Sequence, residues 1–274
     1  MAALDPIAKT AWYCCGVRAA DARSARPICG DMLAERFMTE EGRAIFAPFA
    51  TQFGPNASNA TRHRMIDDLL RERLAADPAR PVLLLGAGFD TRAFRLAGGR
   101  WMELDQPALV ALKEQVLPAA SAPNPLRRHA IDFAHDRLAD ALASWAGTRD
   151  ALVVMEGVSM YLSTAQLHDT ARALHALLPR HTLVCDLLTA TFLRRYGGPL
   201  RQRIEALGGA FAPAHDDPAA WVQAQGYRQR SVASITALTP GPFGRRAPGW
   251  LLDTLLRPVR DGYRLHVFEA VAGT

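Results

Sequence analysis

The stretch that most constrains the fold is residues 81–105, PVLLLGAGFDTRAFRLAGGRWMELD. It begins with an apolar run, 82–85, without polar alternation, which is typical of a parallel strand buried on both faces. A glycine turn follows at 86–88, where the backbone can approach a ligand closely. A second short strand is predicted at 100–104, and the acid Asp105 follows it. An acid about 20 residues after a strand and a glycine turn lies where it can bind the hydroxyls of a ribose.

The glycine turn lacks one feature of dinucleotide-binding turns. The nicotinamide and flavin fingerprint has a third glycine three residues after the second, and Thr91 occupies that position here. The third glycine lets a helix begin under a pyrophosphate, so its replacement favours a nucleoside ligand without a pyrophosphate. S-adenosylmethionine is such a nucleoside, and we expect it ahead of a dinucleotide.

Three motifs, taken in order, resemble those of the leucine carboxyl methyltransferase family. They are LLLGAGFDTRAFRL, MELDQP and MEGVSMYL, the last of which covers residues 155–162. The chain is most similar to the bacterial branch of small-molecule O-methyltransferases, which resembles the polyketide carboxyl methyltransferases. The resemblance extends over nearly the whole chain. It implies a Rossmann-like methyltransferase sheet and S-adenosylmethionine as the cofactor.

Four predicted strands lead to a glycine or an acid, at Gly86, Asp105, Asp132 and Glu156. Because ligands bind beyond the carboxyl ends of parallel strands, we expect these four positions to meet at one site. The pair Asp132-Phe133 suits an adenine, since the carboxylate accepts from the amine and the ring packs on the base. A helix cap is the alternative for Asp132. An acid at Glu156 would offset the positive charge of a sulfonium.

A helix with one apolar face is predicted at 60–74, with Arg62 in its first turn. The family motif R-T-x-F-I-D-D reads RHRMIDD here, and the resemblance implies that its first arginine, Arg62, binds the carboxylate of the methyl donor. Arg64 is the competing candidate. An ion pair at the surface with Asp67 or Asp68 suits Arg64 better than Arg62.

The candidate residues form two sets. The predicted cofactor-binding set is Arg62, Gly86, Ala87, Gly88, Asp105, Gln106, Asp132, Phe133 and Glu156. The predicted acceptor-binding set is Tyr13, Arg18 and Tyr161, because tyrosine hydroxyls and a cation near a lid can contact an anionic substrate. For Tyr161, core packing is almost as good an interpretation.

The order of the predicted elements favours a single α/β domain with a mostly parallel sheet of about seven strands and helices on both faces. Residues 1–58 are expected to form an N-terminal helical cap, and 59–190 the donor-binding core. A lid insert is expected at 191–215, followed by the C-terminal strands at 216–274. The last strand, 263–270, is expected to run antiparallel.

Charge and cysteine content argue against several other classes of protein. The formal net charge is +5, but it comes from dispersed arginines rather than a run of like charges, so we expect no nucleic-acid partner. The four cysteines lack C-x-x-C spacing and histidine partners, so we expect no metal. We see no signal sequence and no apolar run long enough for a membrane span. The sequence therefore predicts a cytoplasmic protein without a membrane partner, and it leaves the oligomeric state open.

The expected activity is methyl transfer to an oxygen of a small molecule of secondary metabolism, with a carboxylate ahead of a phenol or enol. A carboxylate is already ionised at neutral pH, so no strong general base is needed, and no catalytic residue is predicted. A phenol would need a base, for which His63 and His215 are the candidates. The alternatives are a donor-binding protein without activity and, disfavoured by Thr91, an NAD-type oxidoreductase. A protein carboxylate as acceptor remains a minor alternative.

Overall fold

Short apolar runs form the strands at the centre of the structure. In the computed structural model, which describes residues 6–132, 135–241 and 244–271, β1 (Pro81–Leu85) is buried at every position. Its neighbour β4 (Arg149–Met155) is buried over its last five residues. Continuous burial is typical of parallel strands covered on both faces, as predicted for both runs.

Within the described residues, the strands form one seven-stranded sheet in the order β3-β2-β1-β4-β5-β7-β6. The remaining strands are β2 (Arg100–Asp105), β3 (Leu126–Ala130), β5 (Arg180–Leu188), β6 (Tyr227–Ser234) and β7 (Tyr263–Ala270). β7 runs antiparallel to both of its neighbours, whereas the pairs from β3 to β5 are parallel. The mostly parallel α/β sheet with an antiparallel last strand is therefore confirmed.

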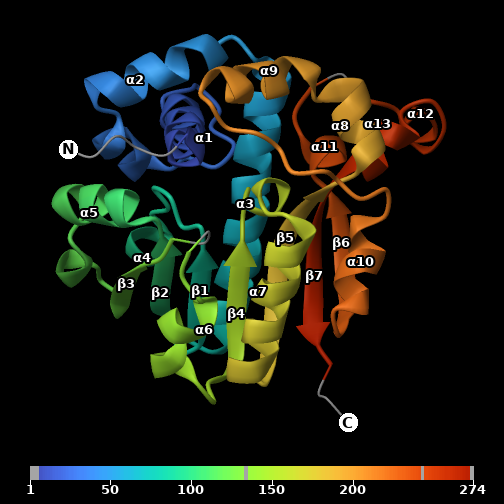
Figure 1. The fold of residues 1–274 in the computed structure, drawn as a ribbon. Helices are drawn as coiled ribbons and strands as arrows, with labels where there is room; N and C mark the ends of the chain where they lie inside the picture. Colours follow the sequence, from blue (N-terminus) through green and yellow to red (C-terminus); the bar gives the residue numbers. More distant parts are fainter. Residues whose placement is uncertain (1–5, 133–134, 242–243, 272–274) are drawn as a thin grey trace.

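Helices cover both faces of the sheet and the carboxyl ends of its strands (Figure 1). The α-helices of the described residues are α1 (Pro6–Ala22), α2 (Glu40–Phe46), α3 (Phe53–Ala76), α4 (Arg92–Arg95), α5 (Pro107–Val116), α6 (Leu138–Ala141), α7 (Thr164–Leu177), α8 (Ala190–Tyr196), α9 (Gly198–Ala206), α10 (Pro218–Ala224), α11 (Ile235–Leu238), α12 (Gly249–Asp253) and α13 (Arg257–Gly262). Short 3-10 helices lie at Met32–Phe37, Ala47–Phe49, Ala119–Ser121, Ala143–Trp145 and Ser159–Tyr161.

The two faces of the sheet have separate cores because side chains alternate along a strand. On one face, Leu83 and Leu85 of β1 pack with Leu174 of α7, together with side chains of α6 and α10. On the other face, Val82 and Leu84 pack with α3 and α4. Each face of β1 thus buries its own set of apolar side chains.

A roof of helices lies over the carboxyl ends of the parallel strands (Figure 1). Helices α1 and α2 form one side of this roof, and α8, α9, α11 and α13 form the other. The first pair falls within the predicted cap, 1–58, and α9 falls within the predicted lid insert, 191–215. The exact division of the chain into these parts stays a prediction.

Two predicted boundaries are wrong. Helix α3 begins at Phe53, so Arg62 lies in its middle and not in its first turn. The early residues FGPNASN are weak helix formers, but Asn59 and Ala60 are buried under the roof, and such packing overrides propensity. The third strand ends at Ala130, before the predicted Asp132-Phe133, and Phe133 lies outside the described residues.

No helix of the described ranges has both the length and the apolar composition that a membrane span requires.

A buried histidine links β5 to β6. His181 lies with its Nδ1 2.7 Å from the carbonyl oxygen of Leu178 and its Nε2 2.8 Å from the hydroxyl of Tyr227. Burial lowers the pKa of His181 to about 4. The unfolded chain, with a histidine pKa near ~6.5, binds the proton first. The contribution of this group to stability is therefore present above about pH 6.5 and is lost as the pH falls toward 4.

We predict that His181→Gln reduces the loss of stability in acid. Lowering the pH from 7 to 4.5 should cost the unaltered protein about 2–3 kcal/mol more unfolding free energy than the variant, because only the unaltered protein loses the histidine contribution. Urea unfolding at the two pH values measures this difference. His168→Gln, at an exposed position on α7, is the matched control, and an equal acid loss in both variants would contradict the assignment.

Candidate active site

The parallel strands end at a cavity of about 230 Å³, here named the strand-end cavity. Among the residues that line it are Arg62, Gly86, Ala87, Gly88, Asp105, Gln106, Asp132 and Glu156. These are the predicted cofactor-binding residues apart from Phe133. The structure therefore brings together eight of the nine predicted cofactor-binding residues, while their contacts with a ligand stay predictions.

The glycine turn forms one wall of the strand-end cavity. Gly86 has φ +67° and Gly88 has φ +44°, a left-handed conformation that favours glycine. A Cβ at Gly86 would lie 2.4 Å from Val158 Cγ2, and one at Gly88 would lie 3.4 Å from the Cβ of Ala11 on α1. A side chain is thus excluded at Gly86 by a clash and disfavoured at Gly88 by the backbone conformation.

Asp105 holds this turn in place at the end of β2. Its Oδ2 accepts a hydrogen bond from the Gly88 N–H at 2.5 Å, and its Oδ1 accepts one from the Gln106 N–H at 2.7 Å. Burial raises the pKa of Asp105, and the two backbone hydrogen bonds oppose this effect. Each carboxylate oxygen has a second lone pair, so Asp105 can also accept from a ligand hydroxyl.

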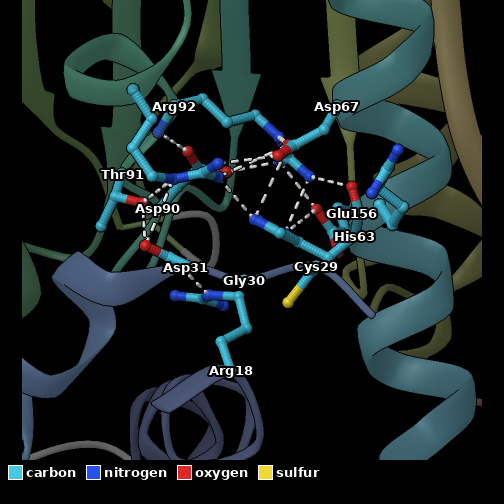
Figure 2. A network of polar contacts seen from close by, with 12 residues as sticks. Arg18, Cys29, Gly30, Asp31, His63, Asp67, Asp90, Thr91, Arg92 and Glu156 are labelled. Atoms are coloured by element: carbon cyan, nitrogen blue, oxygen red, sulfur yellow. Dashed lines mark hydrogen bonds and ion pairs between the residues drawn. The ribbon is translucent and has the colours of Figure 1, made fainter. Parts of the chain in front are cut away.

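Arg92 is the centre of a buried ion network beneath the cavity (Figure 2). Its guanidinium lies 2.6 Å from Asp67 Oδ1, 2.5 Å from Asp90 Oδ2 and 2.8 Å from Glu156 Oε2. Burial by itself raises the pKa of Glu156, but the charge of Arg92 and its neighbours holds that pKa well below its usual range. Asp67, predicted on the polar face of its helix, is fully buried because Arg92 and Arg95 bind it.

The network continues into the roof through Arg18 of α1 (Figure 2). The Arg18 guanidinium donates to Asp31 Oδ2 at 3.0 Å and to the Phe89 carbonyl oxygen at 2.7 Å. Asp31 also caps the 3-10 helix that follows it and accepts from Thr91 Oγ1 at 2.8 Å. Arg18 therefore connects the roof to the glycine turn, and it lines the strand-end cavity. Its predicted contact with the acceptor stays a prediction.

His63, Asp90 and Glu156 form a group whose ligand atoms lie within 4.8 Å of one another. A guanidinium already lies among them, since Arg92 contacts Asp90 and Glu156 and lies 2.8 Å from His63 Nδ1. Burial and the charge of Arg92 lower the pKa of His63. We interpret the group as part of the ion network, not as a metal centre. His63 does not line the strand-end cavity.

Arg62 lines the strand-end cavity, and most of its guanidinium donates hydrogen bonds to other residues of the protein. Its Nε donates to Glu156 Oε1 at 3.0 Å, and its Nη1 donates to Asp186 Oδ2 at 3.0 Å and to the Tyr263 hydroxyl at 2.6 Å. Among the described residues, no hydrogen bond to Nη2 is found. A ligand carboxylate therefore has Nη2 available, and a two-nitrogen fork would require one of the existing bonds to break.

Arg64, the competing candidate, points away from this site. Its Nε lies 2.7 Å from Asp68 Oδ2, and both side chains are about half exposed. The predicted surface ion pair is confirmed.

A second and larger cavity of about 500 Å³, the roof cavity, adjoins the first. The two share Thr10, Cys14, Arg62, Gly157 and Tyr161 as lining residues. Most of its remaining wall is apolar. It includes Leu188 at the end of β5 and, from the predicted lid insert, Phe192, Leu193, Leu200, Ile204 and Phe211. Sequence patterns predicted a lid here but none of these residues, because their side chains meet only when the roof helices pack.

Both predicted tyrosines line the roof cavity. Tyr13 packs on Phe49 with ring centroids 4.5 Å apart, and Tyr161 packs on Phe211 at 5.3 Å. Burial raises the pKa of both hydroxyls well above the usual tyrosine value, so they remain protonated donors. His215 lines neither of the two cavities and stacks on a tryptophan of α10 instead.

Comparison with known proteins decides the family. Residues 11–175 match the model of the leucine carboxyl methyltransferase family. The chain belongs to this family. It is 31% identical over 221 residues to a protein from Streptomyces coelicolor assigned as an S-adenosyl-L-methionine-dependent methyltransferase, covering 73% of this chain and 75% of that protein. It is 29% identical over 202 residues to the tetracenomycin polyketide synthesis O-methyltransferase of Streptomyces glaucescens, covering 71% and 70%.

A Parafrankia protein, also assigned as an S-adenosyl-L-methionine-dependent methyltransferase, is 36% identical over 173 residues, which cover 57% of this chain and only 54% of that relative. Among solved structures, one assigned as a methyltransferase from Thermobifida fusca has a TM-score of 0.58 at 16% identity, covering 88% of this chain and 94% of that one. A DUF574-family protein from Streptomyces avermitilis has a TM-score of 0.57 at 12% identity, covering 93% and 96%. These structures support the fold.

The predicted family, fold and cofactor are thus confirmed: this leucine carboxyl methyltransferase family member is an S-adenosylmethionine-dependent methyltransferase. The oxidoreductase alternative is wrong. The strand-end cavity also fits this cofactor in charge. Its lining carries the carboxylates Asp90, Asp105, Asp132 and Glu156 but only the arginines Arg18 and Arg62. S-adenosylmethionine has a net positive charge, which suits a lining with more acids than cations.

We predict that Asp105→Ala weakens S-adenosylmethionine binding by about 1–3 kcal/mol, because ligand hydroxyls would be buried without an acceptor. Calorimetry measures the change. Asp68→Ala, at the exposed ion pair on α3, should leave the affinity unchanged. Equal affinities for Asp105→Ala and the unaltered protein would remove Asp105 from the cofactor site.

We also predict that Arg62→Lys weakens S-adenosylmethionine binding at least tenfold, whereas Arg64→Lys has no effect. A lysine keeps the charge, but it cannot reproduce the planar donor pattern that serves two acids, a tyrosine and a ligand at once. The exposed pair of Arg64 contributes little in either form. Titration of both variants with S-adenosylmethionine tests this, and the opposite ranking would transfer the role to Arg64.

Proposed function

We propose that the protein transfers the methyl group of S-adenosylmethionine to an oxygen of an apolar small molecule in secondary metabolism, and that this oxygen belongs to a carboxylate. The observation that carries the proposal is the composition of the roof cavity. Its wall is mostly apolar, and among the described residues that line it there is no carboxylate, histidine or lysine. The acceptor must therefore be reactive without a strong base.

A carboxylate meets this requirement because it is ionised at neutral pH, with a pKa of about 4. When bound, S-adenosylmethionine supplies an electrophilic methyl group, which the acceptor oxygen takes while S-adenosylhomocysteine leaves. The protonated hydroxyls of Tyr13 and Tyr161 are the donors that would orient the acceptor carboxylate. The apolar wall would hold the rest of the molecule.

The remaining contribution of the protein is to align the acceptor and exclude water. Orientation of bound reactants alone supplies roughly 7–11 kcal/mol of barrier reduction. Two adjoining cavities that share part of their wall are suited to this task, since each can hold one reactant with its reacting atom at the common boundary. The resemblance to the tetracenomycin polyketide synthesis O-methyltransferase favours a polycyclic or polyketide-like acceptor.

A phenol or enol is the second choice of acceptor. A phenol has a pKa of about 10 and needs a group to take its proton, but the candidates His63 and His215 line neither of the two cavities. The side chain at the shared boundary that comes nearest to a base is Cys14, whose Sγ accepts a hydrogen bond from Asn59. The proposal therefore favours the carboxylate.

We predict turnover of aromatic carboxylic acids and little or none of phenols with the same ring system. Formation of S-adenosylhomocysteine and of a base-labile methyl ester, followed by mass spectrometry, is the readout. With an active acid, the single-turnover rate should be flat from about pH 6 to 9, because the acceptor stays ionised.

Three outcomes would contradict this prediction. A rate that climbs with pH and is lost in Cys14→Ser would indicate a thiol base. An alkali-stable product from a phenol would show that the acceptor class is wrong. Tight binding of S-adenosylmethionine without turnover of any acceptor would favour the alternative of an inactive donor-binding protein.

A further inference from the structure

Asp186 and Tyr263 meet Arg62 where the strand-end cavity and the roof cavity adjoin. Asp186 lies on β5, and Tyr263 is the first residue of β7. The Tyr263 hydroxyl accepts from Arg62 Nη1 at 2.6 Å and donates to Asp186 Oδ2 at 2.9 Å. Arg62 Nη1 also donates to Asp186 Oδ2 at 3.0 Å. The three groups form a closed triangle of hydrogen bonds, and all of them are buried.

The second oxygen of Asp186 holds the turn that follows β4. Asp186 Oδ1 accepts from the N–H of Gly157 at 2.7 Å, and the Ser159 hydroxyl donates to the backbone oxygen of Asp186 at 2.9 Å. Gly157 has φ +68°, and a Cβ there would lie 3.0 Å from Arg62 Nη2. The turn therefore passes beside the one nitrogen of Arg62 that lacks a protein partner among the described residues.

Asp186 acts on both cavities without lining either. Arg62 and Gly157 line both cavities, whereas Asp186 lines neither and is fully buried. One carboxylate thus fixes two parts of their shared wall. Asp186 and Tyr263 both lie beyond residue 175, where the match to the family model ends. The match therefore does not cover them.

We propose that Asp186 and Tyr263 are positioning residues that hold the Arg62 guanidinium with its Nη2 directed at the bound cofactor. A free arginine side chain has many rotamers, and fixing them before binding removes an entropy cost from the binding step. A second layer of hydrogen bonds is the usual way in which a contact group is held in place. The proposal rests on S-adenosylmethionine as the cofactor and does not depend on the identity of the acceptor.

The experiment measures S-adenosylmethionine affinity by calorimetry in Tyr263→Phe. This variant keeps the ring, which packs near Phe192, and removes only the hydroxyl that contacts Arg62. We expect the dissociation constant to rise about five- to tenfold, which corresponds to the loss of one hydrogen bond of ordinary strength. Asp186→Asn, which keeps an oxygen for the Gly157 N–H, should raise it at least as much.

A double-variant cycle separates positioning from packing. If Tyr263 acts through Arg62, adding Tyr263→Phe to Arg62→Met should change the affinity less than twofold. Tyr227→Phe is the matched control, because it removes a buried hydroxyl from a tyrosine that lines neither cavity and contacts His181. It should lower the unfolding temperature without changing the affinity.

Two results would overturn the proposal. One is a folded Tyr263→Phe protein that binds S-adenosylmethionine as tightly as the unaltered protein. The other is a loss of affinity from Tyr263→Phe that is equally large in the protein with Arg62 and in the Arg62→Met variant. If Arg62→Met does not fold, the contrast between Tyr263→Phe and Tyr227→Phe decides alone. Failure of the unaltered protein to bind S-adenosylmethionine is a separate result, and it would overturn the cofactor assignment together with this proposal.

Discussion

The ion network around Arg92 is the interaction on which the rest of the structure depends. Its guanidinium is fully buried and joins Asp67 of α3, Asp90 of the glycine loop and Glu156 after β4. These elements come from three distant parts of the chain. Removing one partner of a buried ion pair leaves an unpaired charge and costs about 3–5 kcal/mol. The same contacts that fix the cofactor site therefore also fix the packing of α3 against the sheet.

The parallel sheet explains why so many acids gather in one place. The carboxyl ends of β1, β2 and β4 meet at a single edge, where each strand leads to a polar or glycine residue. Buried acids at such an edge repel one another unless cations lie between them, and the arginines of α1, α3 and α4 supply those cations. The cavity itself is lined by more carboxylates than arginines, which suits a positively charged cofactor.

The sequence predicts the strands and the cofactor side of the site well, because both depend on local patterns. Apolar runs predict buried strands. Because ligands bind beyond the carboxyl ends of parallel strands, these runs then select residues such as Asp105 and Glu156. The burial of Asp67 could not be predicted, since helical patterning assigns charged residues to solvent while its arginine partner lies 25 residues further along the chain. Asp186 was not among the predicted site residues. It is an acid near the carboxyl end of a buried strand, so the rule that ligands bind beyond the carboxyl ends of parallel strands also selects it.

The two cavities differ in how they are built, and this difference bears on specificity. The strand-end cavity is made by strand ends and a glycine turn, whose positions the hydrogen-bonded sheet fixes. The roof cavity is lined mainly by side chains of the roof and not by strand ends, so its shape can change with little effect on the first cavity. Arg62 and Gly157 are among the five residues that belong to both walls. A change of acceptor is therefore compatible with substitutions throughout the roof, but the boundary that Asp186 holds must keep its geometry for the two reactants to remain aligned.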